Sequence, residues 1–137
     1  MVKIEEQRFT FKKEERITGT KRVEAIFAAG KSFISYPLRV VYLIHEQSAS
    51  AKCSILVSVP KKRIKKAVHR NRIKRLIRET YRLNNKLISN IDISDKTLDI
   101  ALVYVKDTVS NYADIEKAMQ KALTQIAIRI KKTEESE

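Results

Sequence analysis

Residues 61–84 hold most of the positive charge of this chain and have the sequence KKRIKKAVHRNRIKRLIRETYRLN. Between Lys61 and Arg82 there are 11 Lys or Arg residues and one acid, Glu79, so this segment carries +10 of the formal net charge of +13. Side chains of like charge repel one another along a helix, and a single acid offers little relief. We therefore expect a polyanionic partner to complete this segment.

From Val68 onward, the segment has the periodicity of an amphipathic helix at about 100° per residue. One arc of that helix is mainly apolar and consists of Ile73, Leu76, Ile77, Thr80 and Leu83. The opposite arc is basic and polar and consists of Arg70, Asn71, Lys74, Arg75, Arg78 and Arg82. A charged run is often only a solvated surface, but here acids are almost absent, and the planar guanidinium group suits phosphates and base stacking. The pattern favours nucleic-acid binding.

Length and composition limit the class of protein. The 137 residues, 43% hydrophobic and 33% charged, are enough for one domain with a modest core. No apolar run approaches the ~20 residues that span a bilayer, and no signal peptide opens the chain. We therefore expect a cytoplasmic protein that binds no membrane. We also expect a flexible arm at residues 1–15, a single RNA-binding α+β domain at residues 16–130 and a frayed tail at residues 131–137.

Residues able to catalyse a reaction or bind a metal are sparse. Cys53 is the only cysteine, which excludes an internal disulfide and a zinc site of several cysteines. His45 and His69 are far apart, although His69 lies beside the basic arc and could touch RNA. There is no dense carboxylate cluster for two metal ions, and Gly19 and Gly30 are too few for a phosphate-binding loop. The residues therefore predict an RNA-binding module without a catalytic residue or metal site of its own.

A short helix is predicted before residue 30, because Val23, Ile26 and Phe27 fall on one of its faces. Gly30 is expected to end it in the left-handed conformation.

Strands are predicted by alternating apolar residues in residues 31–44 and 52–59, and Pro60, which lacks an amide donor, should end the second stretch. Residues 84–96 are rich in Asn, Asp and Ser and are expected to form a loop. A further strand follows at residues 98–105.

A closing helix is predicted after Asn111, its expected N-cap. Its apolar stripe consists of Ile115, Met119, Ala122, Leu123, Ile126 and Ile130. The whole pattern predicts an α+β fold, a two-layer sandwich of a four-stranded sheet and helices in the order α-β-β-β-α-β-α.

The basic segment resembles a known family. Residues 70–78, RNRIKRLIR, are similar to the Arg-Asn-Arg signature helix of the bacterial ribonuclease P protein component. The resemblance extends over ILVSVPKK at residues 55–62 and ETYR at residues 79–82, with a fainter match from Arg16 to Lys31. Together these stretches cover roughly residues 9–130. The resemblance implies that the two strands flanking the basic helix lie side by side and parallel, joined by a left-handed crossover, which is unusual.

The resemblance also implies a function. In this family the catalyst is an RNA subunit, which uses Mg²⁺ to remove the 5′ leader from precursor tRNA, and the protein is an accessory in a 1:1 complex. The resemblance assigns Arg72, Arg75 and Arg78 to the catalytic RNA and places Arg70, Asn71 and Lys74 near the junction with a second surface, a cleft. The full set of expected RNA-binding residues is Lys61, Lys62, Arg70, Asn71, Arg72, Lys74, Arg75, Arg78 and Arg82. The expected cleft for the single-stranded leader consists of Phe27, Tyr42, Ser58, Lys61, Lys62, Arg70 and Lys74.

One departure from the family pattern affects the cleft. The family often has a second aromatic residue where this chain has Val23, so stacking on the leader is either weaker or uses Phe33 or Tyr36. Core packing is an equal alternative for each aromatic residue. Alternative functions are a ribosomal or ribosome-assembly protein, a self-sufficient endonuclease, and a DNA-binding helix.

Overall fold

The predicted order of elements is confirmed, with one short helix added. The computed structural model describes residues 20–46, 53–89, 91, 93 and 96–136. Its elements are α2 (Thr20–Ala29), β1 (Lys31–Ser35), β2 (Leu38–His45), β3 (Cys53–Ser58), α3 (Ala67–Asn84), α4 (Lys86–Ser89), β4 (Thr97–Tyr104) and α5 (Tyr112–Ser136). None of these helices is both long and apolar enough to cross a membrane.

The strands form a mixed sheet in the order β1-β2-β4-β3. β1 and β2 are an antiparallel hairpin, and β2 also pairs antiparallel with β4. β3 pairs parallel with β4, from Cys53 beside Leu98 to Ser58 beside Val103. The expectation that the strands flanking the basic helix lie side by side and parallel is therefore confirmed. The hand of this crossover stays a prediction of the resemblance.

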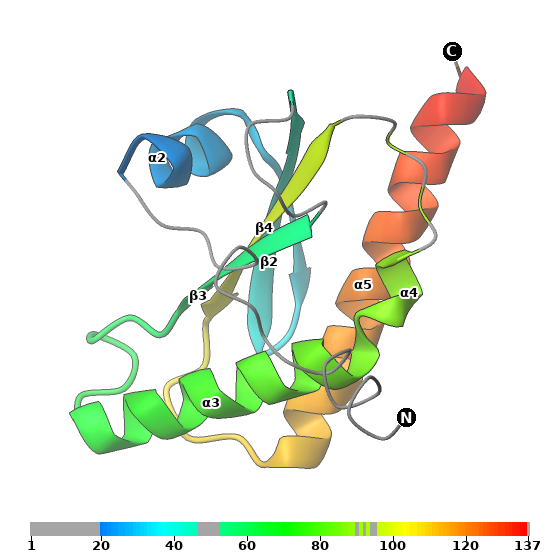
Figure 1. Cartoon of the computed structure of the whole chain (residues 1–137). Helices are drawn as coiled ribbons and strands as arrows, with labels where there is room; N and C mark the ends of the chain where they lie inside the picture. Colours follow the sequence, from blue (N-terminus) through cyan, green and yellow to red (C-terminus); the bar gives the residue numbers. More distant parts are fainter. Residues whose placement is uncertain (1–19, 47–52, 90, 92, 94–95, 137) are drawn as a thin grey trace, which may run out of the picture.

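Each face of the sheet packs against different helices, with α2 on one side and α3 and α5 on the other (Figure 1). The larger core contains alternate residues of the strands, including Leu38, Val40, Ile55, Ile100, Leu102 and Tyr104, and the whole predicted stripe of α5. On the opposite face, Ile26 of α2 packs against Val41 and Ala101. One face of the sheet thus carries most of the apolar burial, and α2 covers part of the other.

The buried face of α3 is confirmed at its centre. Ile73, Ile77 and Thr80 are buried, as the periodicity predicts, whereas Leu76 and Leu83 at the edge of the apolar arc are half-buried. Tyr81 is also buried, and its hydroxyl donates a hydrogen bond to the Cys53 Sγ atom at 3.3 Å. Tyr81 was not among the residues predicted to be buried, although a residue four positions after Ile77 lies on the same helix face.

The start of α5 is capped as predicted. The Asn111 Oδ1 atom accepts a hydrogen bond from the Asp114 backbone N–H at 2.8 Å. The Asp114 carboxylate in the first turn also suits the positive end of the helix dipole. The backbone of α5 is helical to Ser136, and fraying of residues 131–137 stays a prediction. The expected arm at residues 1–15 lies outside the described residues.

Gly30 ends α2 for a different reason from the one predicted. Its φ lies outside the left-handed region, and its N–H donates to the Ile26 carbonyl at 2.8 Å. A side chain here would put its Cβ 2.8 Å from the Val41 Cγ1 atom and closer still to that carbonyl. Glycine is therefore required by the close Ile26 carbonyl of α2 together with the approach of β2, and not by a left-handed turn.

The predicted loop at residues 84–96 contains α4, a single helical turn. Ile88 of α4 and Ile93 beyond it are buried in the larger core. Apolar burial of these two residues outweighs the turn preference of the surrounding Asn and Ser. The expectation of an irregular loop is therefore wrong for Lys86–Ser89.

We predict that Ile77→Ala lowers the free energy of unfolding by ~2–5 kcal/mol, because the side chain is fully buried and its loss leaves a cavity. Val68→Ala is the matched control: the Val68 side chain lies on the same helix but is 69% exposed. The control should change stability by less than about 0.5 kcal/mol. Denaturant unfolding followed by circular dichroism measures both. If the two variants were equally stable, α3 would have to pack against the sheet through a face that does not include Ile77.

Candidate nucleic-acid interface

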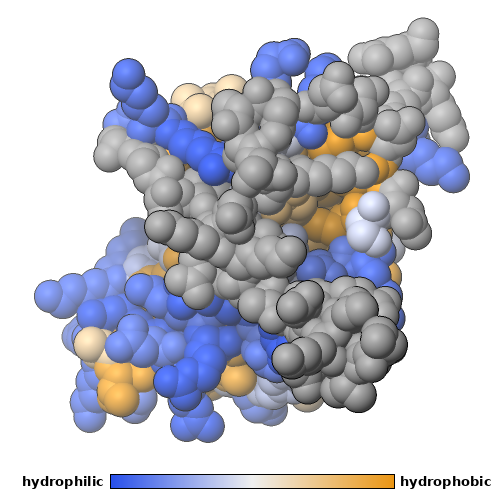
Figure 2. Space-filling view, in the orientation of Figure 1, coloured by the Kyte–Doolittle hydropathy of each residue, from blue (hydrophilic) through white to orange (hydrophobic). Residues whose placement is uncertain are grey.

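The outer side of α3 is a basic surface. Asn71, Arg72 and Arg75 are exposed, and Lys74, Arg78 and Arg82 are half-buried. Lys61, Lys62, Lys65 and Lys66, in the segment before the helix, are all exposed. The space-filling view shows a largely hydrophilic surface over α3 (Figure 2). Because the apolar arc is buried, folding places these cations together on one side of the molecule.

The only acid of the segment is already paired. The Arg82 guanidinium contacts both carboxylate oxygens of Glu79, with the Nε–Oε2 bond at 3.2 Å. Nearby, Tyr112 of α5 donates to the Glu116 Oε2 atom at 3.2 Å. Burial, followed by the Glu116 carboxylate, raises the pKa of Tyr112, so this hydroxyl stays protonated and adds no anion. The one acid of the segment is thus engaged by a cation of its own helix.

The start of α3 also favours an anion from outside. Its first turn contains no acid, and Lys66 at the N-cap makes no side-chain capping hydrogen bond. Lys65 and Lys66 instead add positive charge at the positive end of the helix dipole, which is the unfavourable arrangement. A phosphate group near this end would relieve both sources of repulsion.

Arg70 shapes the basic surface as well as contributing to it. Its Nη1 atom donates to the carbonyl oxygens of Ile64 at 3.0 Å and Lys65 at 2.7 Å. Ile64 is itself buried in the core. These contacts fix the segment that carries Lys61 and Lys62 against the first turn of α3. This structural role was missed, because sequence periodicity treats Arg70 only as a member of the exposed arc.

A second surface lies on the face of the sheet that carries α2. Leu56 packs in the cluster formed by Ile26, Val41 and Ala101, and Ser58, two residues further along β3, points to the same face. The register places Ser58 beside Val103, and Val103 beside Arg39. Ser58 and Val103 are half-buried and Arg39 is exposed. Arg39 and Val103 therefore join this surface, although the sequence analysis named neither.

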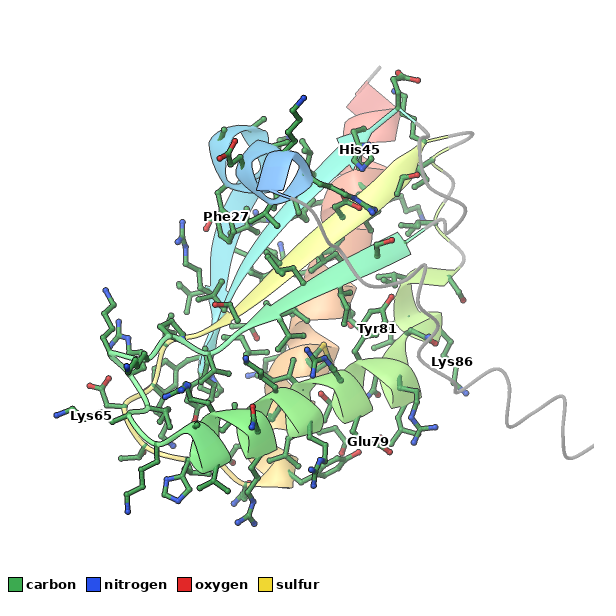
Figure 3. The ribbon with its side chains drawn as sticks, turned by 60° about the vertical axis from the view of Figure 1, so that its left-hand side comes forward. Phe27, His45, Lys65, Glu79, Tyr81 and Lys86 are labelled. Atoms are coloured by element: carbon green, nitrogen blue, oxygen red, sulfur yellow. The ribbon has the colours of Figure 1, made fainter. Side chains whose placement is uncertain are left out.

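Phe27 projects from α2 towards the open part of this face (Figure 3). Its side chain is 43% exposed, which is unusual for a phenylalanine in a small domain and leaves part of the ring free to contact a ligand. Lys61 and Lys62 follow Ser58 by three and four residues. Phe27 and Ser58 share this face, and the leader cleft expected for them with Lys61 and Lys62 stays a prediction.

Tyr42 does not belong to this surface, which corrects the expectation for it. Its side chain is 5% exposed in the larger core, where it packs edge to face with Phe33 at a centroid distance of 6.2 Å. Val41, the preceding residue, faces α2, so Tyr42 faces α5. Phe33 lies on this same face and has Arg129 stacked 4.7 Å from its ring centroid. Neither aromatic ring reaches the α2 face.

A charged cluster fastens α2 to the sheet. Asp99 of β4 has a side chain only 1% exposed, and Arg22 of α2 binds it through Nη2 at 2.7 Å and Nε at 3.0 Å. The His45 Nε2 atom of β2 lies 2.7 Å from Asp99 Oδ2, the same oxygen that accepts the hydrogen bond from Arg22 Nε. No buried side-chain polar atom among the described residues lacks a partner. The cluster sets the position of α2 and hence of Phe27.

The part of the chain that the structure describes contains no cluster of metal-binding side chains. No three His, Cys, Asp or Glu residues come together there in a way that could hold an ion. Asp99, the buried carboxylate, is already occupied by Arg22 and His45. The arrangement of the described residues therefore suits binding of a polyanion and does not assemble a metal centre.

The chain is similar to proteins of one kind. A family model described as Ribonuclease P matches residues 11–127. The ribonuclease P protein component of Porphyromonas gingivalis is 42% identical over 121 residues, which cover 87% of this chain and 88% of that protein. The corresponding component of Clostridium botulinum is 34% identical over 119 residues, which cover 85% of this chain and 97% of that protein.

Two solved structures share the fold. The RNase P protein of Staphylococcus aureus has a TM-score of 0.62 and 23% identity, covering 86% of this chain and 92% of that one. The RNase P protein of Thermotoga maritima has a TM-score of 0.59 and 21% identity, covering 81% of this chain and 96% of that one. At these identities the likeness concerns the fold.

We predict that Arg22→Met lowers the free energy of unfolding by ~3 kcal/mol, because it removes the guanidinium that pairs with the buried Asp99 carboxylate. Lys21→Met is the control, since Lys21 is the exposed neighbour on the same helix and loses the same charge. Thermal and denaturant unfolding measure both. A variant at Arg22 as stable as the control would mean that the cluster does not hold α2 in place.

Proposed function

The chain belongs to the ribonuclease P protein family, and from this premise we propose that it is the protein subunit of that enzyme. In this proposal it binds a catalytic RNA and the 5′ leader of precursor tRNA in the cytoplasm, one protein to one RNA. The observation that carries the proposal is the separation of two surfaces, a basic one on α3 and one with an exposed aromatic ring on the α2 face of the sheet. Each surface suits a different kind of RNA.

The α3 surface suits folded RNA. Its arginines are spaced along a rigid helix that is fixed by the burial of Ile73 and Ile77, so they meet an array of phosphates without a large loss of conformational entropy. Arginine forks bind phosphate oxygens in pairs, which fixes orientation as well as adding affinity. Release of counterions from the RNA supplies most of the driving force. We assign the catalytic RNA to this surface.

The α2 face suits an unpaired strand. A partly exposed Phe27 offers a ring on which a base can stack, and Lys61 and Lys62 can follow the phosphates beyond the end of β3. Stacking on an aromatic ring tolerates any base, which fits a leader whose sequence differs from one precursor to another. Tyr42 takes no part in this cleft. With Val23 half-buried against the sheet, Phe27 is the aromatic residue of α2.

The chemical step belongs to the RNA in this proposal. Mg²⁺ held by the RNA subunit would activate the water that cleaves the phosphodiester bond. The residues of this chain do not fit a metal centre of their own, since no group of donors that could hold one forms among the described residues. Their part is to bind the catalytic RNA, to hold the leader and thereby to position the cleavage site.

The alternative from another class is a ribosomal or ribosome-assembly protein, and a self-sufficient endonuclease is a third. One assay with purified components distinguishes both alternatives from the proposed function. Precursor tRNA should remain intact with the protein alone and be cut at the 5′ end when the catalytic RNA is added. Cleavage by the protein alone would identify an endonuclease, and no effect of the protein on the RNA-dependent reaction would favour ribosome assembly.

We predict that Arg72→Ala with Arg75→Ala reduces the steepness with which affinity for the catalytic RNA falls with salt. Each lost phosphate contact lowers the log-log slope by roughly 0.7–0.9, so the double variant should lose about 1.5. The control is Lys96→Ala with Lys131→Ala, which removes two exposed charges outside α3. Binding measured between low and moderate salt gives both slopes. If the two double variants have the same slope, the α3 surface does not contact this RNA.

We predict that Phe27→Ala weakens binding of precursor tRNA to the reconstituted holoenzyme by roughly five- to 150-fold, the effect of one lost stack of ~1–3 kcal/mol. Binding of mature tRNA should hardly change, because mature tRNA has no leader. Single-turnover cleavage of saturating precursor should also be preserved, since uniform binding does not affect the chemical step.

The control for Phe27→Ala is Leu87→Ala, which truncates a similarly exposed apolar side chain on α4. Leu87→Ala should leave both tRNA affinities unchanged. Equal weakening of precursor and mature tRNA by Phe27→Ala would place this ring in the catalytic-RNA contact. Loss of the saturated rate with intact binding would contradict the division of labour between protein and RNA.

A further inference from the structure

A pocket of about 280 Å³ lies between the β1–β2 turn and the first turns of α5 and is lined by Tyr36, Pro37, Lys106, Ser110, Asp114, Lys117, Ala118 and Lys121. Its walls are the β1–β2 turn, the segment after β4 and the first three turns of α5. β1 and β3 are the two edges of the sheet, and α3 packs beside β3. The pocket shares no lining residue with the two surfaces described above, although Asp107, next to Lys106, pairs with Arg63 of the basic segment at 3.1 Å.

Hydrogen bonds fix each wall of this pocket. The Val105 N–H donates to the Pro37 carbonyl at 2.9 Å, which ties the hairpin turn to the end of β4. The Ser35 hydroxyl donates to the Ala118 carbonyl at 2.7 Å, which ties β1 to α5. The hydroxyl groups of Tyr104 and Ser110 are 2.7 Å apart and hold the segment after β4. The pocket is thus formed before any ligand arrives, so binding need not organise it.

The lining is positively charged and has one exposed aromatic ring. Lys106, Lys117 and Lys121 stand against a single acid, Asp114, so the pocket has a local charge of +2 at neutral pH. None of the three lysines forms an ion pair with another residue in the described part of the chain. Tyr36 is 63% exposed, the highest exposure among the large aromatic and aliphatic residues after Val68. Cations around an open ring are the combination that binds a nucleotide.

We propose that this pocket binds one unpaired nucleotide of an RNA strand, with its phosphate among the three lysines and its base on the Tyr36 ring. The volume of about 280 Å³ lies just below the roughly 300–1,000 Å³ of small-molecule sites, which suits one nucleotide and not a folded partner. A paired base cannot reach the ring, so the strand must be single at this point. The site is additional to the proposed function and does not depend on which RNA the α3 surface binds.

Nuclear magnetic resonance on the full chain tests this site directly. The probes are a uridine trinucleotide and inorganic phosphate, each added to the wild type and to a background variant with Phe27→Ala, Arg72→Ala and Arg75→Ala. We expect the trinucleotide to shift the backbone amides of Tyr36, Lys106, Lys117 and Lys121 in both proteins. Because the background variant weakens the other two surfaces, persistence of these shifts separates this site from the proposed function.

Variants of the pocket complete the test. Tyr36→Ala should weaken the trinucleotide at these amides by roughly five- to 150-fold, the loss of one stack, without changing the response to phosphate. Lys117→Gln with Lys121→Gln should weaken both probes. Tyr36, Lys117 and Lys121 are exposed, so these variants should fold normally. Unchanged chemical shifts in the rest of the protein would confirm that they do. The proposal is overturned if the trinucleotide leaves the chemical shifts of the pocket amides unchanged. It is also overturned if the trinucleotide binds no more tightly than phosphate.

Discussion

The burial of one side of α3 is the interaction on which the rest of the structure depends. Ile73, Ile77 and Tyr81 are held in the larger core, and this apolar contact is what offsets the repulsion among the cations on the outer side. The same helix connects β3 to β4, which are adjacent and parallel. The contact thus fixes the β3 edge of the sheet beside β4 and presents the basic surface in one step. Without it, the segment would be a charged chain with little reason to be helical.

The α2 face depends on a different kind of interaction. Its apolar cluster is small, with Ile26, Val41 and Ala101 fully buried, so the Arg22–Asp99–His45 cluster supplies much of what holds α2. A buried carboxylate that accepts two hydrogen bonds from one guanidinium fixes direction as well as position, since the guanidinium binds in one geometry. That direction leaves Phe27 at the edge of the helix, where its ring is partly exposed (Figure 3).

Local patterns predicted most of the fold. The 3.6-residue period located Ile73, Ile77 and the buried stripe of α5, because each helix has one clearly apolar side. The strand period is less informative where both alternations are apolar, as in β2, so it could not say that Val41 faces α2 and Tyr42 faces α5. The same period also predicted the basic surface, because the cations of α3 lie on the side of the helix opposite its apolar residues.

Contacts distant in sequence could not be predicted. Arg22 and Asp99 are 77 residues apart, and His45 and Asp99 are 54 apart, so no local period relates them. A polar residue in the middle of an apolar strand was the one available signal for Asp99. Gly30 likewise reflects the approach of α2 to Val41, which depends on how the layers pack. The pocket beside Tyr36 joins three separate segments and has no signature in any of them.

Site-directed crosslinking tests the assignment of two RNAs to two surfaces most directly. A photo-crosslinker would be attached to Phe27→Cys or Arg75→Cys in a Cys53→Ser background, since Cys53 is the only native cysteine. Each protein would be irradiated in the holoenzyme with bound precursor tRNA, and primer extension would identify the modified nucleotides. We predict crosslinks from position 27 to the 5′ leader and from position 75 to the catalytic RNA. Crosslinks from both positions to the same molecule would contradict the two-surface arrangement.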